Sequence, residues 1–269
     1  ATATTKTPKK TTPMSTWILL RGLTREQAHW GFFPDLLRQA LPPGTLMLTP
    51  DLPGNGTLWQ SRSPSTVQGM VDHSRQALRD AGHLPPYHVL AMSLGAMVTV
   101  DWATRHPEEL SVAILISTSL RPFSPFWHRL RPHQYGRILH LLSSHPTDLA
   151  WEQAIMAMTT CHPANPQATV ARWVAARRSH PVSVGNAWRQ LMAAARYRAP
   201  AKPPAVPMLL LNGEGDQLVH PDCSQALAHA WQLPWVTHPT AGHDLPLDAG
   251  PWVVSQVQAR LAQRPQRPA

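Results

Sequence analysis

Short apolar runs alternate with amphipathic stretches along most of the chain. The apolar runs lie at 15–23, within 44–56, and at 87–92, 111–120 and 206–216, and a shorter one follows at 235–240. The helical spacing of apolar residues predicts helices at 34–41, 64–81, 94–105, 222–231 and 250–262. Strands that are apolar throughout are typical of a sheet buried on both faces. The pattern therefore predicts an α/β fold with a mostly parallel sheet flanked by helices.

The alternation of strands and helices stops once, between 121 and 204. This segment contains helical patches such as RILHLLSS, LAWEQAIMAM and ATVARWVAARR, broken by prolines. The sequence therefore predicts a sheet domain made of 14–120 and 205–263, with a helical lid inserted at 121–204. The polar termini, 1–13 and 264–269, are predicted to be disordered. Four large aromatic residues of the segment are expected to pack it on the sheet domain: Trp127, Trp151, Trp173 and Trp188.

Charge is unevenly distributed along the chain. The formal net charge is +9 although only 14% of the residues are charged. The 121–204 segment holds ten Arg and one Lys, with Asp148 and Glu152 as its acids. These cations are either solvated or recognise an acidic carrier protein or an anionic ester. Nucleic-acid binding is not expected, because the basic residues belong to no recognised nucleic-acid module.

Several other protein classes are disfavoured by the sequence. No apolar run reaches the roughly 18 residues that a membrane span needs. The first thirteen residues lack the apolar stretch of a secretory signal. Cys161 and Cys223 are the two cysteines and form no CxxC pair, which argues against a zinc or dithiol redox site. These features predict a cytoplasmic location.

A serine stands at the junction of a predicted strand and a predicted helix, in the run YHVLAMSLGAMVTVDWA. Such a junction exposes a hydroxyl above the sheet when small residues stand two before and two after it, as in the pattern G-x-S-x-G. Here Ala91 takes the first glycine position and Gly95 the second. Ser93 is thus a candidate nucleophile; the alternative is a serine that caps the helix.

A candidate base and a candidate acid follow later strands. His243 lies in TAGHD after the last strand, and Asp216 lies in NGEGDQLV after the strand before it. The carboxyl ends of parallel strands meet at one edge of a sheet, so these side chains are expected to lie near Ser93. Glu214 and Asp222 are the competing acids.

Backbone N–H groups for an oxyanion are also expected near Ser93. One would be that of Leu94, at the start of the helix, and the other that of Leu23, after Gly22 in the loop following the first strand. The turn DLPGNG at 51–56 is interpreted as structural.

These motifs resemble those of the α/β-hydrolases, in particular small members with a helical lid. The resemblance covers 14–263 and rests on RGLTREQAHWGFFPDLL, TPDLPGNG, VLAMSLGAMVTVDWA, LLLNGEGDQLV and AGHDLPLD, in that order. It implies a triad of Ser93, Asp216 and His243, a lid over the site, and no metal or organic cofactor. The layout is similar to that of esterases that act on methyl esters of carrier-bound acyl chains in biotin synthesis.

The resemblance implies a serine hydrolase that cleaves carboxylic esters through an acyl-enzyme. A thioesterase, a carrier-linked acyl ester hydrolase, a carbon–carbon hydrolase or lyase, and a non-catalytic binding protein remain alternatives. Arg21, Gly22, His29 and Trp30 are the candidate substrate contacts. Arg21 stands where many members have His, and an Arg at this place is commonly paired with a neighbouring acid.

Overall fold

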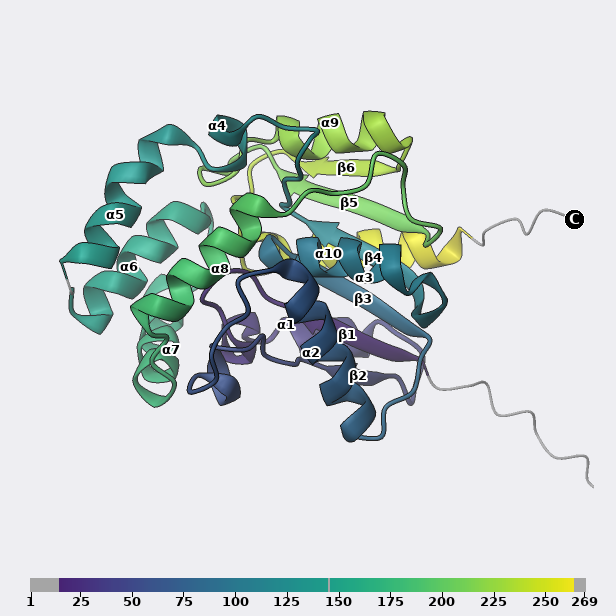
Figure 1. Cartoon of the computed structure of the whole chain (residues 1–269), viewed down its shortest axis with the longest axis horizontal. Helices are drawn as coiled ribbons and strands as arrows, with labels where there is room; N and C mark the ends of the chain where they lie inside the picture. The colour runs from purple at the N-terminus through teal and green to yellow at the C-terminus, as the bar shows by residue number, and fades with distance from the viewer. Residues whose placement is uncertain (1–14, 145, 264–269) are drawn as a thin grey trace, which may run out of the picture.

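A single parallel sheet forms the centre of the molecule. The computed structural model describes residues 15–144 and 146–263, and the tails predicted at 1–13 and 264–269 lie outside these ranges. The strand order is β2-β1-β3-β4-β5-β6, and every neighbouring pair is parallel (Figure 1). The strands are β1 (Thr16–Leu20), β2 (Leu46–Leu48), β3 (Tyr87–Met92), β4 (Leu110–Ile116), β5 (Met208–Gly213) and β6 (Trp235–His238). The predicted α/β fold is confirmed.

Helices cover both faces of this sheet. Alternate residues of β1 enter different cores: Ile18 and Leu20 pack with one, and Trp17 and Leu19 with the other. The first core also contains residues of three helices, α2 (Val67–Asp80), α3 (Leu94–Arg105) and α9 (Asp222–Trp231). The second contains residues of α1 (Phe33–Gln39) and α10 (Leu245–Ala262). Burial of both faces explains why the strands are apolar throughout.

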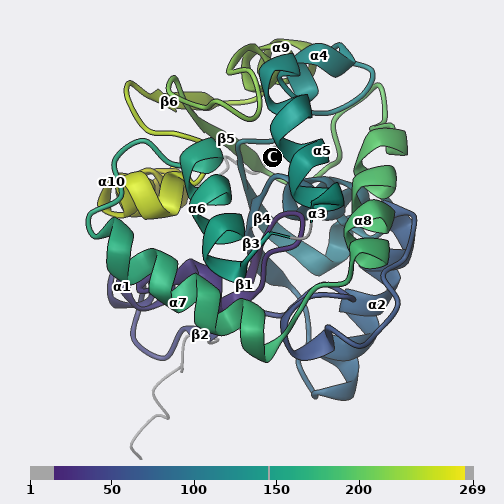
Figure 2. The same cartoon turned by 90° about the vertical axis from the view of Figure 1, so that its left-hand side faces the viewer.

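A helical segment separates β4 from β5. It consists of α4 (Phe126–Arg129), α5 (Tyr135–Ser143), α6 (Asp148–Thr159), α7 (Pro166–Ser179) and α8 (Val184–Arg196). Figures 1 and 2 show α5 to α8 gathered to one side of the sheet. All five helices lie within 121–204, and we refer to residues 121–204 as the helical segment. None of the helices in the described ranges is both long and apolar enough to cross a membrane.

Several boundaries differ from the predicted ones for local reasons. The helix predicted from residue 64 begins at Val67, because the side chain of Thr66 accepts the Gly69 N–H and caps the helix. Helix α10 begins at Leu245 rather than at residue 250, since a first turn precedes a non-helical Ala249 at φ −145° and ψ 42°. Strand β2 is short and pairs only with β1.

Candidate active site

Ser93 occupies a strained turn between β3 and α3. Its φ is 51° and its ψ is −116°, a combination that non-glycine residues seldom adopt and that concentrates at functional sites. The Ser93 N–H donates to the Ile116 carbonyl at 3.0 Å, and the side chain makes no helix-capping hydrogen bond. The structure thus gives no support to the alternative of a serine that caps the helix.

Small neighbours allow this turn. A Cβ on Gly95 would lie 2.6 Å from the Leu20 carbonyl oxygen, so only glycine fits there. Ala91 is fully buried in the strand and pairs with Leu20 of β1. The alanine in place of the first glycine is accommodated without disrupting the strand.

The predicted acid and base are joined by a short hydrogen bond. His243 Nδ1 lies 2.7 Å from Asp216 Oδ2, and both side chains are buried. The other carboxylate oxygen of Asp216 accepts the N–H groups of Leu218 and Val219 at 2.8 and 2.9 Å. With Nδ1 donating to Asp216, the Nε2 of a neutral His243 carries the lone pair. The competing acids Glu214 and Asp222 are exposed.

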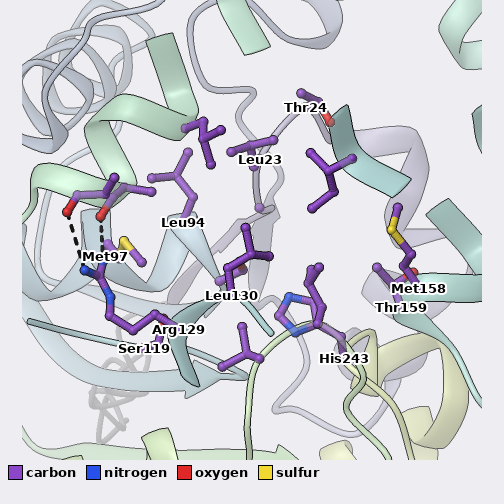
Figure 3. Close-up of a pocket in the computed structure, with 18 of the residues that line it drawn as sticks. Leu23, Thr24, Leu94, Met97, Ser119, Arg129, Leu130, Met158, Thr159 and His243 are labelled. Carbon is purple, nitrogen blue, oxygen red and sulfur yellow. Dashed lines mark hydrogen bonds between the residues drawn. The ribbon is translucent and has the colours of Figure 1, made fainter. Parts of the chain in front are cut away.

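Ser93 and His243 line one cavity of about 920 Å³. Figure 3 shows His243 on one side of this cavity and Leu23 and Leu94 on another. No hydrogen bond joins the Ser93 hydroxyl to His243 within the described ranges, a separation that is common without a bound substrate. Most other lining residues are apolar, and the helical segment contributes many of them, including Leu130, Trp151 and Met158.

The loop after β1 packs directly against Ser93. A Cβ on Gly22 would lie 3.1 Å from the Ser93 Cβ, so glycine allows the close approach. In the described part of the chain, neither the Leu23 N–H nor the Leu94 N–H has a backbone acceptor outside regular secondary structure. Both residues line the cavity beside Ser93.

Arg21 is held by an ion pair. Its guanidinium donates to both carboxylate oxygens of Asp244, at 3.2 and 2.6 Å, and the two residues are buried. Asp244 follows His243 in the chain, so this pair connects the loop after β1 with the loop that carries the histidine. Both residues line the cavity, but the charge of Arg21 is compensated there.

His29 and Trp30 lie outside the lining of the large cavity, contrary to the predicted substrate contact. Trp30 is part of the core around α1 and packs on Phe33. His29 is buried against Trp173 of α7 and lies 2.8 Å from the Arg25 guanidinium. The predicted loop curls into a short helix over 27–30, which turns both side chains into the protein.

The burial of His29 predicts an acid-sensitive stability. Burial, followed by the charges of Arg25 and Arg21, lowers the pKa of His29 well below its usual 6.5. Below pH 6.5 the unfolded chain binds a proton at this histidine that the folded chain does not. The free energy of unfolding therefore falls by about 1.4 kcal/mol for each unit that the pH is lowered. We expect the melting temperature of His29→Gln to fall less than that of the wild type when the pH is lowered from 7.5 to 5.5. Equal losses in thermal unfolding would contradict the assignment.

Among residues 15–144 and 146–263, two groups of side chains have a spacing suited to a metal ion. They are His128, His220 and Asp222, and His106, Glu108 and Glu109. None of these six residues lines the cavity of Ser93. The geometry around Ser93 is that of a serine, a histidine and a carboxylate.

A model of the Alpha/beta hydrolase family matches residues 17–256. The chain belongs to the α/β-hydrolase family. The strained serine after β3, the histidine paired with an acid after later strands and the parallel sheet all agree with this membership.

Individual α/β-hydrolases similar to this chain include esterases. A pimeloyl-[acyl-carrier protein] methyl ester esterase of Aromatoleum aromaticum is 27% identical over 237 residues, covering 87% of this chain and 85% of the relative. A thermophilic esterase from Thermogutta terrifontis has a TM-score of 0.68 at 20% identity, covering 93% and 90% of the two chains. A hydrolase from Oleispira antarctica has a TM-score of 0.72 at 14% identity, covering 93% and 92%. The curated relative and the family together indicate an ester-hydrolysing enzyme, while the two structures show the shared fold.

Two polar residues beside the site are not among the predicted site residues. Gln190 of α8 and Asn55 of the DLPGNG turn are both fully buried and hydrogen-bonded to each other. They are 135 residues apart. A lone glutamine within the predicted helical lid carries no signal, and Asn55 in a turn motif has an ordinary structural explanation.

Proposed function

We propose that this α/β-hydrolase cleaves carboxylic esters with Ser93 as nucleophile, through an acyl-enzyme. The observation that carries the proposal is the strained backbone of Ser93, in a cavity that it shares with His243, itself bonded to buried Asp216. The hydroxyl, the imidazole and the carboxylate come from the ends of three different strands. This is the arrangement that nucleophilic catalysis by serine requires.

In the proposed mechanism His243 acts first as base and then as acid in each half-reaction. His243 Nε2 takes the proton of the Ser93 hydroxyl as Oγ attacks the acyl carbon, and the developing oxyanion is bound by the N–H groups of Leu23 and Leu94. His243 then gives the proton to the departing alcohol. His243 then takes a proton from a water molecule as the water oxygen attacks the acyl-enzyme. The bond between Ser93 Oγ and the acyl carbon breaks, His243 returns the proton to Ser93 Oγ, and the carboxylic acid leaves. Asp216 stays ionised and stabilises the imidazolium.

The cavity favours an ester with an apolar acyl group. Its volume is in the range of small-molecule sites, and the helical segment supplies much of its apolar wall. We therefore propose that this segment, 121–204, acts as the lid over the site.

A carrier-bound acyl ester is the favoured substrate within this class. Arg121 and Arg198 line the cavity and are exposed, while Arg129 donates to the Ala194 carbonyl at 2.6 Å. None of these three has a carboxylate partner in the described ranges. They leave positive charge at the cavity for an acidic carrier, and the similarity to an acyl-carrier protein ester esterase supports this assignment.

The test compares a methyl ester of an acyl chain on an acidic carrier protein, the same acyl chain as a free p-nitrophenyl ester, and the corresponding thioester. We expect cleavage of both esters, whether the leaving group is methanol or p-nitrophenol. In the double variant Arg121→Glu/Arg198→Glu, kcat/KM for the carrier-bound ester should fall by more than about tenfold, because the rate of association falls when complementary charge is reversed. The fall should be larger than that for the free ester.

Arg79→Glu is the control for a charge reversal away from the site, since Arg79 is exposed on α2 and does not line the cavity. An equal fall in kcat/KM for the carrier-bound ester in Arg79→Glu and in Arg121→Glu/Arg198→Glu would contradict the carrier assignment. Cleavage of the thioester alone would contradict the ester assignment.

A further inference from the structure

The loop that offers the Leu23 N–H is a tight, strained turn. The Arg25 N–H donates to the Gly22 carbonyl at 3.2 Å, which places Leu23 and Thr24 at the centre of the turn. Thr24 has a φ of 57°, a value that is unfavourable for a β-branched residue and that asks for support from its surroundings. The position of the Leu23 N–H therefore depends on what holds Thr24 and Arg25.

Two carboxamide side chains hold this turn from outside. Gln190 Oε1 accepts the Thr24 N–H at 2.8 Å, and Gln190 Nε2 donates to Asn55 Oδ1 at 2.7 Å. Asn55 Nδ2 in turn donates to the Arg25 carbonyl at 3.0 Å. The hydrogen bonds form a closed chain from Thr24 through Gln190 and Asn55 to Arg25. Both carboxamides are fully buried, so no water competes for their donors and acceptors.

The same helix that supplies Gln190 also lines the cavity. Ala187 and Leu191 of α8 face the cavity, and Gln190 lies between them in sequence and bonds to the turn. One rigid element therefore contacts both the space for the acyl group and the backbone that carries an oxyanion donor. Figure 3 shows Leu23 and Thr24 together at the rim of that space.

We propose that Gln190 and Asn55 are positioning residues that set the Leu23 N–H for the oxyanion, so that the docked position of α8 completes the oxyanion hole. This rests on the proposed ester hydrolysis at Ser93. Neither residue touches the reacting atoms. Their effect is on the transition state, because the turn is needed when negative charge develops on the carbonyl oxygen and not when the neutral ester binds.

Asn186 provides a matched control on the same helix, one turn from Gln190. It is buried, its Oδ1 accepts the Ser63 N–H at 2.9 Å, and its Nδ2 donates to the Ser61 carbonyl at 3.0 Å. Like Gln190, it fixes α8 to a loop of the sheet domain through a side-chain oxygen that accepts one backbone N–H. Unlike Gln190, it makes no contact with residues 22–25 among the hydrogen bonds of the described chain.

The experiment measures kcat and KM for a p-nitrophenyl ester, and the inhibition constant of a boronic acid that forms a tetrahedral adduct with the serine. The variants are Gln190→Met, Asn55→Ala, the pair together, Asn186→Ala and Ser93→Ala. Gln190→Met keeps the side-chain shape and removes both hydrogen bonds. We expect it to lower kcat by about 10- to 100-fold, since loss of one oxyanion donor costs about 10²–10³, with KM changed less than about twofold. Boronic acid affinity should fall in parallel with kcat/KM.

Asn55→Ala is expected to give a similar loss in kcat, and the double variant a loss smaller than the product of the two, because both act through one turn. Asn186→Ala should lower the melting temperature about as much as Gln190→Met does and leave kcat within about threefold of the wild type. Equal kcat losses in Gln190→Met and Asn186→Ala, or a rise in KM alone, would overturn the positioning role. Wild-type turnover in Ser93→Ala would overturn the proposed function itself. If Gln190→Met does not fold, the comparison of Asn55→Ala with Asn186→Ala decides the question by the same criteria.

Discussion

Ser93→Ala is expected to lower kcat for ester hydrolysis by about 10⁴- to 10⁶-fold. The hydroxyl supplies the only bond to the acyl group in the proposed mechanism, and serine-to-alanine changes at such nucleophiles reach about 10⁶. The methyl group of alanine fits the site of the Ser93 Cβ, so stability should change little. Turnover is measured on a p-nitrophenyl ester, with thermal unfolding alongside.

Ser119→Ala is the control for this variant. Ser119 is buried and lines the same cavity, so its replacement removes a hydroxyl from the same environment. We expect its kcat to stay within about threefold of the wild type. A comparable loss in both variants would indicate that the cavity, rather than the Ser93 hydroxyl, had been damaged.

Asp216→Asn is expected to lower kcat by about 10⁴-fold while leaving the fold intact. An asparagine carbonyl can still accept the N–H groups of Leu218 and Val219, which bond to one oxygen of the present carboxylate. Its NH₂ group would then face His243 Nδ1 and favour the tautomer with the proton on Nε2. That tautomer cannot accept the Ser93 proton, and the equivalent change in a serine protease triad costs about this factor.

Glu214→Gln is the companion measurement for the acid. Glu214 is exposed in the same loop, and its carboxylate makes no hydrogen bond to His243. Its kcat should be close to that of the wild type. A large loss of kcat in Glu214→Gln, with Asp216→Asn active, would show that Glu214 and not Asp216 is the acid that pairs with His243.

The regular elements follow closely from residue pattern because local and tertiary preferences agree. The bounds predicted for 94–105 and 222–231 coincide with α3 and α9. Helix α3 begins directly after a serine that only small neighbours can accommodate. Helix α9 ends at Trp231, and the next residue, Gln232, has a left-handed conformation. Where a single residue redirects the chain, as Ala249 does within α10, the sequence periodicity gives no warning.

Some residues of the candidate site could be predicted from the sequence, and others could not. Asp216 and His243 could be predicted because each follows a strand of a parallel sheet, whose carboxyl ends meet. The ion pair of Arg21 with Asp244 and the bonds of Gln190 to Thr24 and Asn55 join residues far apart in sequence, and only the packed structure brings them together. The inward turn of His29 and Trp30 depends on a short helix whose residues have no helical periodicity.

Covalent labelling identifies the nucleophile, which we propose to be Ser93. The wild-type protein is treated with an alkyl fluorophosphonate, which loses fluoride to a reactive serine, and the labelled residue is mapped by peptide mass spectrometry. We expect one phosphonyl group, on Ser93, with loss of ester turnover in step with labelling, and no label in Ser93→Ala. Ester turnover that persists in a fully labelled protein, or a label carried equally by Ser93→Ala, would contradict it.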